Sequence, residues 1–213
     1  MIRINRFPEP STFHNLVEKP GLKYLHTNPH PTSNEFRKHA YWQRIHNDIY
    51  TLYNGICAYC ASWSPRSSKS PNQTSIDHFI PKCEYPIGAY NWENYRLCRA
   101  RINANKGDNP QIVDPFYVNN DWFQIDFSTF LILANCNSPP YAFYRIQATI
   151  DCLELNGNDY VNERIQIIRE YCLGRTTLSN LRAKYPFIAS EIVRCNFDTA
   201  FRPSMSAYFG RIP

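Results

Sequence analysis

Residues 74–108 read TSIDHFIPKCEYPIGAYNWENYRLCRARINANKGD, and they carry the most informative pattern in the chain. Its apolar pattern predicts two short strands, at residues 74–79 and 95–98, followed by a short helix at residues 99–106. Successive side chains of a strand point to opposite faces, so Asp77 and His78 point in different directions. One of the two can therefore bind a cation while the other faces a substrate.

The polar side chains of this stretch have the chemistry of a metal-dependent hydrolase. Carboxylate and amide oxygens are suitable ligands for Mg²⁺ or Mn²⁺, so Asp77 and Asn103 would hold one metal between them if the helix brings them together. A neutral histidine such as His78 is the usual general base for deprotonating water. A metal held there would stabilise the charge that develops during phosphodiester hydrolysis. The alternative is that the Asp-His pair is a surface turn and that Asn94 and Asn103 are loop or cap residues.

The stretch resembles the HNH nuclease motif, which is also called the ββα-metal finger. The resemblance lies in three elements in order: Asp77-His78 with Pro81, Asn94 nine residues before Asn103, and Asn103 three residues before Lys106. In that family the aspartate and the last asparagine or histidine bind the metal, and the first histidine is the general base. The middle asparagine braces the loop that presents the histidine. The resemblance therefore implies metal ligands at Asp77 and Asn103, a base at His78 and a supporting catalytic role for Asn94.

Basic residues concentrate around this motif. They are Lys82, Arg96, Arg99, Arg101 and Lys106. We expect Lys106, Arg99 and Arg101 to contact backbone phosphate, and the alternative is an ordinary solvated charged face. No recognition helix is visible, so any sequence specificity would come from the shape of the nucleic acid or from a partner.

The cysteines leave two interpretations open. Many HNH proteins bind a structural zinc through one CxxC pair before the motif and a second pair just before its last asparagine. Cys57 and Cys60 match the first pair, whereas Arg99 and Ile102 stand where the second would be. Either Cys57 and Cys60 hold a structural zinc with substitute ligands such as Cys83 and Cys98, or they form a knuckle packed on the core.

The remainder of the chain predicts an α+β fold, with the ββα-metal finger embedded in a mainly helical domain that has an additional β-hairpin. Residues 1–32 contain five prolines and are expected to form an extended arm. Residues 33–110 would hold a helix at about 34–53 and the nuclease core. Residues 111–213 would form a hairpin from residues 122–133 and 141–148, followed by a helical region packed on the core.

Composition limits the class of protein. The chain has 213 residues, of which 43% are hydrophobic and 19% charged, which is an ordinary globular balance. Lysine and arginine exceed aspartate and glutamate by 23 − 18 = 5, an excess that permits a polyanionic partner without requiring one. Its apolar runs are far shorter than the ~20 residues of a membrane span, and the opening residues lack the apolar core of a secretory signal. We therefore expect a cytoplasmic protein without a membrane partner.

A looser similarity extends over most of residues 1–175. The Tyr85-Pro86…Trp92-Glu-Asn94 spacing, Val113-Asp-Pro115 and Leu153-Glu-Leu-Asn156…Arg164 look like the Septu-type (PtuB) and retron-associated HNH nucleases of bacterial anti-phage defence. That resemblance implies control by an ABC- or SMC-like ATPase subunit. This chain has no Walker A motif, so any ATP dependence must come from another chain.

The function expected from the sequence is a metal-dependent HNH endonuclease that hydrolyses nucleic acid, with DNA favoured as the substrate. It would use Mg²⁺ or Mn²⁺. The alternatives are an RNA-cleaving nuclease and a catalytically idle finger that serves as a nucleic-acid-binding or assembly subunit.

Overall fold

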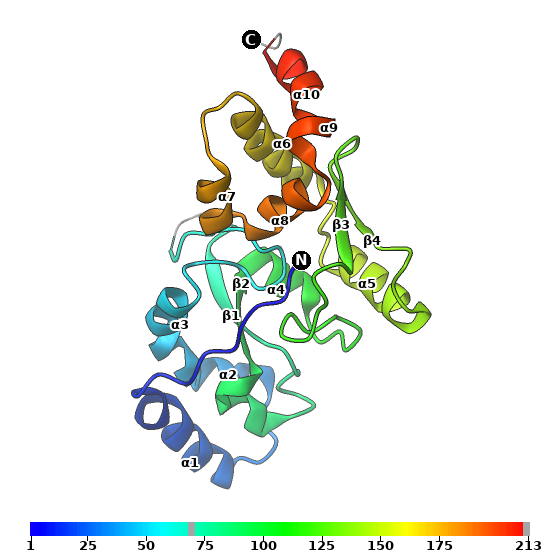
Figure 1. The fold of residues 1–213 in the computed structure, drawn as a ribbon. Coiled ribbons are helices and arrows are strands. Elements are labelled where there is room, and N and C mark those ends of the chain that lie inside the picture. The colour runs from blue at the N-terminus through cyan, green and yellow to red at the C-terminus, as the bar shows by residue number, and fades with distance from the viewer. Residues whose placement is uncertain (68–70, 211–213) are drawn as a thin grey trace.

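The computed structural model describes residues 1–67 and 71–210. Strand β1 (Thr74–His78) pairs antiparallel with β2 (Tyr95–Arg99), and helix α4 (Ala100–Lys106) follows β2 directly and packs against both strands. The expected strand, strand and helix are thus confirmed to within a residue at each end. Together with a second hairpin and the surrounding helices they make an α+β fold (Figure 1).

The β1–β2 hairpin separates two hydrophobic cores. Ile76 and Leu97 are cross-strand neighbours and point into the core of the N-terminal half. Cys98 points into the core of the C-terminal half, together with Ile102 of α4. Because side chains alternate along a strand, Asp77 lies on the C-terminal side of the hairpin and His78 at its N-terminal side.

The expected extended arm is partly wrong. Residues 1–10 are extended, but a π-helical turn (His14–Glu18) runs directly into α1 (Lys19–Thr27). Pro20 is tolerated because it lies in the first turn of α1, where the backbone needs no N–H donor. Phe13 and Val17 are fully buried, so this segment forms part of the core of its own chain.

The single helix expected at residues 34–53 is divided into three pieces. They are α2 (Ser33–Lys38), a 3-10 turn (Tyr41–Ile45) and α3 (His46–Leu52). At the break, the ring of His39 stacks on Tyr24 with ring centroids 3.8 Å apart. The carbonyl of His39 also accepts a hydrogen bond from the Tyr90 hydroxyl at 3.1 Å. These contacts come from distant parts of the chain, so the local periodicity does not reveal the break.

The second hairpin is shorter than expected. It consists of β3 (Phe123–Asp126) and β4 (Leu131–Ala134), which fall in the first of the two segments assigned to it and extend one residue beyond its end. The segment 141–148 belongs instead to helix α5 (Pro140–Cys152). Pro140 occupies the first turn of α5, and the buried Ala142, Ile146 and Ile150 recur at four-residue intervals on one helix face.

The C-terminal region is helical, as expected. Its elements are α6 (Asn158–Cys172), α7 (Leu178–Lys184), α8 (Pro186–Arg194), α9 (Phe197–Ala200) and α10 (Arg202–Phe209). Gly174 has a φ of 72° just after α6, which is the left-handed backbone expected at a helix end. The tail packs on its own chain, because Phe209 is buried and Phe201 stacks on Phe197.

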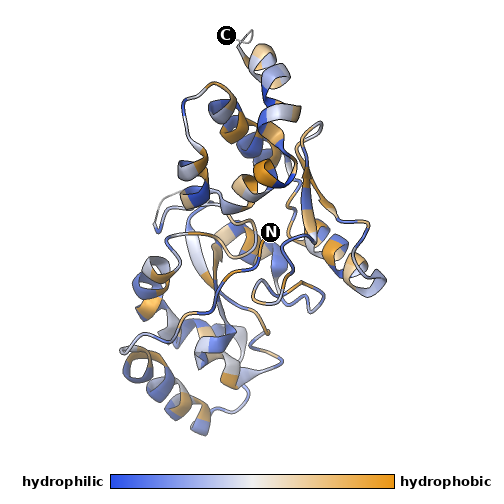
Figure 2. Cartoon of the chain, viewed as in Figure 1, coloured by the Kyte–Doolittle hydropathy of each residue, from blue (hydrophilic) through white to orange (hydrophobic). Residues whose placement is uncertain are grey.

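Hydropathy follows this packing. Helices α5, α6 and α8 each carry both hydrophobic and hydrophilic positions, as helices that cover a core must (Figure 2). Among the described residues, no helix has the length and apolarity needed to cross a membrane.

Two further 3-10 turns, Pro86–Tyr90 and Trp92–Asn94, lie in the loop that joins β1 to β2. This loop passes close to His78 and therefore helps to shape the site.

Candidate active site

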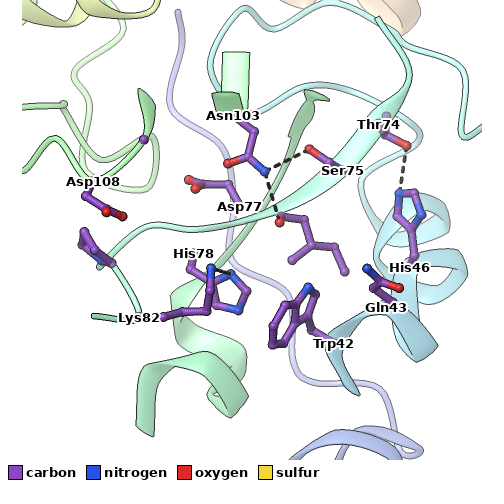
Figure 3. Close-up of a pocket in the computed structure, with 13 residues that line it drawn as sticks. Trp42, Gln43, His46, Thr74, Ser75, Asp77, His78, Lys82, Asn103 and Asp108 are labelled. Atoms are coloured by element: carbon purple, nitrogen blue, oxygen red, sulfur yellow. Dashed lines mark hydrogen bonds between the residues drawn. The ribbon is translucent and has the colours of Figure 1, made fainter. Parts of the chain in front are cut away.

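A cavity of about 610 Å³ lies along β1. Within the described part of the chain β1 pairs only with β2, so its other edge is free, and all five β1 residues line the cavity. Asp77, His78 and Asn103 therefore meet in one place, as the sequence predicts (Figure 3). The remaining lining residues include Trp42, Gln43, His46, Lys82 and Asp108.

Asp77 is a buried carboxylate with two polar partners. The Tyr59 hydroxyl donates a hydrogen bond to Oδ2 at 2.5 Å, and the Lys106 ammonium lies 3.2 Å from Oδ1. Lys106 also donates to the backbone carbonyl of His78 at 3.1 Å. Burial raises the pKa of the Tyr59 hydroxyl, and the charge of Asp77 raises it further, so the phenol stays protonated as a donor. Each carboxylate oxygen keeps a lone pair that can face the cavity.

The ring of His78 is fixed in orientation and tautomer. Nε2–H donates to the carbonyl of Ala89 at 3.1 Å, which leaves the lone pair on Nδ1. Nδ1 accepts from the Lys82 ammonium at 3.3 Å. Trp42 and Tyr95 pack against the imidazole in T-shaped arrangements, with ring centroids at 4.6 Å and 5.2 Å.

Burial lowers the pKa of His78 well below its usual value, and the positive charge of Lys82 acts in the same direction. The imidazole is therefore neutral at physiological pH, which is the form that a general base requires.

Asn103 presents an oxygen to the same cavity. Its amide nitrogen donates to the Ser75 hydroxyl at 3.2 Å and to the Ile76 carbonyl at 3.4 Å, on the free edge of β1. The amide oxygen is thereby turned toward the Asp77 carboxylate (Figure 3).

The residues present fit a hard divalent cation such as Mg²⁺ or Mn²⁺. Asp77 and Asn103 offer one carboxylate and one amide oxygen, and Mg²⁺ is commonly held by few protein ligands together with water and substrate phosphate. No group of three or more His, Cys, Asp or Glu side chains gathers as a metal site anywhere in residues 1–67 and 71–210. Water and phosphate oxygens would therefore have to complete the coordination.

Asn94 braces the loop behind the histidine. Its amide oxygen accepts from the Ile80 N–H at 2.7 Å, and its amide nitrogen donates to the carbonyls of Ile80 and Gly88, both at 3.0 Å. Gly88 is required here, because a Cβ on it would lie 2.9 Å from the Asn94 amide nitrogen and 2.4 Å from the ring of Tyr85. Asn94 does not line the cavity, so it can act on the site only through this loop.

The residues expected to bind phosphate form ion pairs with carboxylates of the same chain. Arg99 is buried in an ion pair with Glu163, and Lys106 is buried in the ion pair with Asp77. Arg101 lies outside the cavity and pairs with Asp159 at 2.6 Å and with Glu154 at 3.5 Å. Each of the three cations thus has a carboxylate partner in this structure, and phosphate binding by Arg99, Arg101 and Lys106 stays an untested prediction.

Cys57 and Cys60 form a tight turn beside β2. The Ala61 N–H donates to the Cys57 carbonyl at 2.9 Å, and the Arg99 N–H approaches the Cys57 sulfur at 3.4 Å. Cys83 is exposed, whereas Cys98 is buried near the pair. Among the described residues, Cys57 and Cys60 are not part of any group of three or more His, Cys, Asp or Glu side chains that could hold a metal ion. These contacts are those of a knuckle packed on the core. The structural zinc stays an untested prediction.

The structure adds residues that the sequence did not assign to the site. Tyr59 contacts Asp77 from between the two cysteines, 18 positions away in the chain. Trp42 and His46 come from the N-terminal helices, and His46 Nε2 lies 3.0 Å from the Thr74 hydroxyl. Only Lys82 carried a sequence signal, because it lies four residues after His78 in a basic neighbourhood.

Comparison with models of known protein families gives no match, and comparison with curated proteins gives none either. The site is therefore interpreted from its own geometry.

Proposed function

We propose that this chain is a metal-dependent endonuclease of the HNH type, with a ββα-metal finger formed by β1, β2 and α4. The observation that carries the proposal is that Asp77, His78 and Asn103 line one cavity, with Asn94 bracing the loop behind the histidine. A carboxylate, an amide oxygen and a neutral imidazole are the groups that hydrolysis of a phosphodiester requires at one place.

In the proposed mechanism, His78 Nδ1 accepts the proton of the attacking water. The Nε2–H bond to Ala89 keeps the ring in the tautomer that has its lone pair on Nδ1. Asp77 and Asn103 would hold the Mg²⁺ or Mn²⁺ ion, which when bound supplies electrostatic stabilisation of the charge on the reacting phosphate. The indole of Trp42 and the phenol of Tyr95 flank the imidazole and limit its contact with bulk water.

DNA is the favoured substrate and RNA the alternative, because the same groups can act on either backbone. Following the resemblance to Septu-type and retron-associated nucleases, the chain would act in the cytoplasm as the effector of an anti-phage system. An ABC- or SMC-like ATPase subunit would control it, since a free nuclease of broad specificity would damage the host.

A second candidate rests on a specific observation. The Asp77 carboxylate already contacts the Lys106 ammonium and the Tyr59 hydroxyl, and the ammonium opposes a cation at the same oxygens. If this pairing prevents metal binding, the finger is catalytically idle and serves as a nucleic-acid-binding or assembly subunit.

Cleavage of plasmid DNA and of RNA in parallel, with Mg²⁺ or Mn²⁺ and with EDTA, tests the proposal. We expect EDTA to abolish cleavage by the wild type, and His78→Ala to reduce the rate by the ~10²–10⁴-fold that general-base catalysis contributes. The exposed His30 provides the matched control, since His30→Ala removes a histidine outside the cavity and should retain wild-type activity.

Calorimetry with Mn²⁺ separates the two candidates. The nuclease proposal requires wild-type binding that Asp77→Ala and Asn103→Ala both weaken. Absence of metal binding and of cleavage, with nucleic-acid binding retained, would establish the idle finger instead.

A further inference from the structure

Cations around the site differ in whether they have a carboxylate partner. Four of the five basic residues of the motif region are paired: Arg96 with Asp114, Arg99 with Glu163, Arg101 with Asp159 and Lys106 with Asp77. Lys82 is the exception, because within the described residues it forms no ion pair. Its positive charge is therefore the one still available to an anionic ligand in the cavity.

Lys82 lies where two cavities adjoin. It lines both the 610 Å³ cavity along β1 and a second cavity of about 430 Å³ on the side of α2. Trp42 and Asp108 line both cavities as well, so the two adjoin at these three side chains. Arg37 lines the second cavity as well and adds a positive charge there.

The ammonium of Lys82 is hydrogen-bonded to His78 Nδ1, the atom that accepts the proton of water in the proposed mechanism. It donates to His78 Nδ1 at 3.3 Å and lies 5.4 Å from the centroid of the Trp42 ring. While this hydrogen bond persists, the Nδ1 lone pair cannot accept a proton from water. The base is thus correctly oriented but blocked in the free protein.

A phosphate provides a better partner for this ammonium than an imidazole does. An ammonium and a phosphate carry opposite charges, so their Coulomb attraction adds to the hydrogen bond, whereas a neutral imidazole offers the ammonium only a lone pair. The lysine side chain has a flexible four-carbon stem, so its head can change partner without a backbone movement.

We propose that Lys82 is the phosphate-binding cation of this site, and that a backbone phosphate of the bound nucleic acid draws its ammonium away from His78 Nδ1 and so releases the base. The catalytic consequence of releasing His78 rests on the proposed nuclease function, but the phosphate contact itself can be tested without turnover. Lys82 is then a substrate-binding residue that also positions His78 in its resting state.

Binding in EDTA tests the phosphate contact. A fluorescently labelled DNA oligonucleotide is titrated with wild type, Lys82→Met, Lys82→Arg and the control Lys23→Met, whose lysine is exposed on α1 outside both cavities. Losing one phosphate contact should reduce the slope of log K against log salt by about 0.7–0.9 in Lys82→Met. Lys82→Arg and Lys23→Met should keep the wild-type slope. An unchanged slope in Lys82→Met, or no binding by the wild type, would overturn the inference.

The release of His78 has a spectroscopic readout. Long-range ¹H–¹⁵N spectra at fixed pH report the environment of His78 Nδ1, and inorganic phosphate serves as the probe. We expect phosphate to move the Nδ1 signal of the wild type toward its position in Lys82→Met, and to have little effect on Lys82→Met itself. A wild-type signal that phosphate leaves in place would refute the release.

Cleavage kinetics add a readout that depends on activity. Lys82→Met should raise KM while kcat stays within about threefold, since the variant loses uniform binding rather than a transition-state contact. A large fall in kcat at unchanged KM would contradict the inference. If the wild type cleaves nothing, the nuclease proposal fails, and the binding and spectroscopic experiments still decide the role of Lys82.

Discussion

Asp77 shows how a buried charge constrains the residues around it. Its side chain is only 3% exposed, and the partner Lys106 is completely buried. A carboxylate in such a place needs a cation and hydrogen bonds, because taking an unpaired charge out of water costs several kcal/mol. Lys106 and Tyr59 meet this need, which explains why a lysine in the expected phosphate-binding position points inward.

Replacing Lys106 tests this explanation. Lys106→Met keeps most of the stem volume but leaves the Asp77 carboxylate buried without a cation, so we expect a loss of about 3–5 kcal/mol in unfolding free energy. Urea denaturation measures it. The double variant Asp77→Asn/Lys106→Met should recover part of the loss, and a loss below about 1 kcal/mol in the single variant would mean that the ion pair is not a structural one.

His78 should make stability depend on pH. Burial lowers its pKa below the value of about 6.5 that an unfolded histidine has, so below that pH the unfolded chain binds more protons than the folded one. The neutral ring therefore makes its full contribution to the free energy of unfolding above about pH 6.5. This contribution is lost as the pH falls, by up to about 1.4 kcal/mol per pH unit.

Urea unfolding at several pH values, for wild type and His78→Gln, checks this prediction. The variant should show a weaker fall in unfolding free energy between about pH 6.5 and pH 5.5. Burial lowers the pKa of His46 too, so the wild type and the variant share that contribution and only their difference is informative. Parallel curves would contradict the prediction.

Among the elements, the loop between β1 and β2 is as important for the geometry of the site as the strands are. It runs from residue 79 to 94, and one side chain, Asn94, ties its two ends and its middle together through Ile80 and Gly88. The same loop supplies the Ala89 carbonyl, which accepts from both His78 and the Tyr95 hydroxyl. Its conformation therefore determines the orientation of the imidazole.

Asn94→Ala should affect stability and rate but not metal affinity. Removing the side chain leaves backbone groups of Ile80 and Gly88 without partners, which we expect to cost about 2–3 kcal/mol. Asp77 and Asn103 remain in place, so Mn²⁺ affinity by calorimetry should be unchanged while cleavage slows. The matched control is Asn91→Ala in the same loop, which removes only a cap on the Glu93 N–H and should cost about 1 kcal/mol.

Elements were predictable where local pattern and tertiary contacts agree. The strands and helix of residues 74–106 follow from their own residues, and the site residues His78, Asp77 and Asn103 meet because that order of elements brings them together. The aromatic run around Tyr141 and Tyr144 resembles a strand locally, yet it is a helix with these two rings exposed. Nor could the sequence show that Arg99 is neutralised, because its partner Glu163 lies 64 residues further along the chain.

In the molecule as a whole, β1, β2 and α4 lie between two separate cores. Arg99 connects these elements to the C-terminal half, since its guanidinium binds Glu163 of α6, the Ser64 hydroxyl and the Trp63 carbonyl. The Arg99 side chain is 2% exposed, so this carboxylate is needed to stabilise its buried charge.

Glu163→Ala should therefore weaken the attachment of α6. We expect a loss of about 2–4 kcal/mol in unfolding free energy, because a buried guanidinium is left without its carboxylate. On the same helix, Glu170 pairs with Arg175 at the exposed surface, so Glu170→Ala should cost less than about 1 kcal/mol. Equal effects of the two variants on the urea midpoint would argue against a special role for the buried pair.

The N-terminal segment should be indispensable to the core of the N-terminal half of the molecule. Phe13 packs against Trp92 and Tyr95, with ring centroids at 5.8 Å and 6.0 Å, and the Trp92 indole donates to the Phe7 carbonyl at 2.8 Å. Removing residues 1–32 would uncover these rings directly behind the site. We expect the shortened chain to lose its compact fold, as circular dichroism and size-exclusion chromatography would show.

Point variants make the same prediction quantitative. Phe13 is 1% exposed, so Phe13→Ala should cost about 3–5 kcal/mol, whereas Phe7→Ala at the 36% exposed Phe7 should cost clearly less. A shortened chain that folds with unchanged thermal stability would contradict the prediction and return residues 1–32 to the role of an arm for a partner. If the prediction holds, a surface for the proposed ATPase subunit must be sought on the folded molecule, and co-purification has to use the full chain.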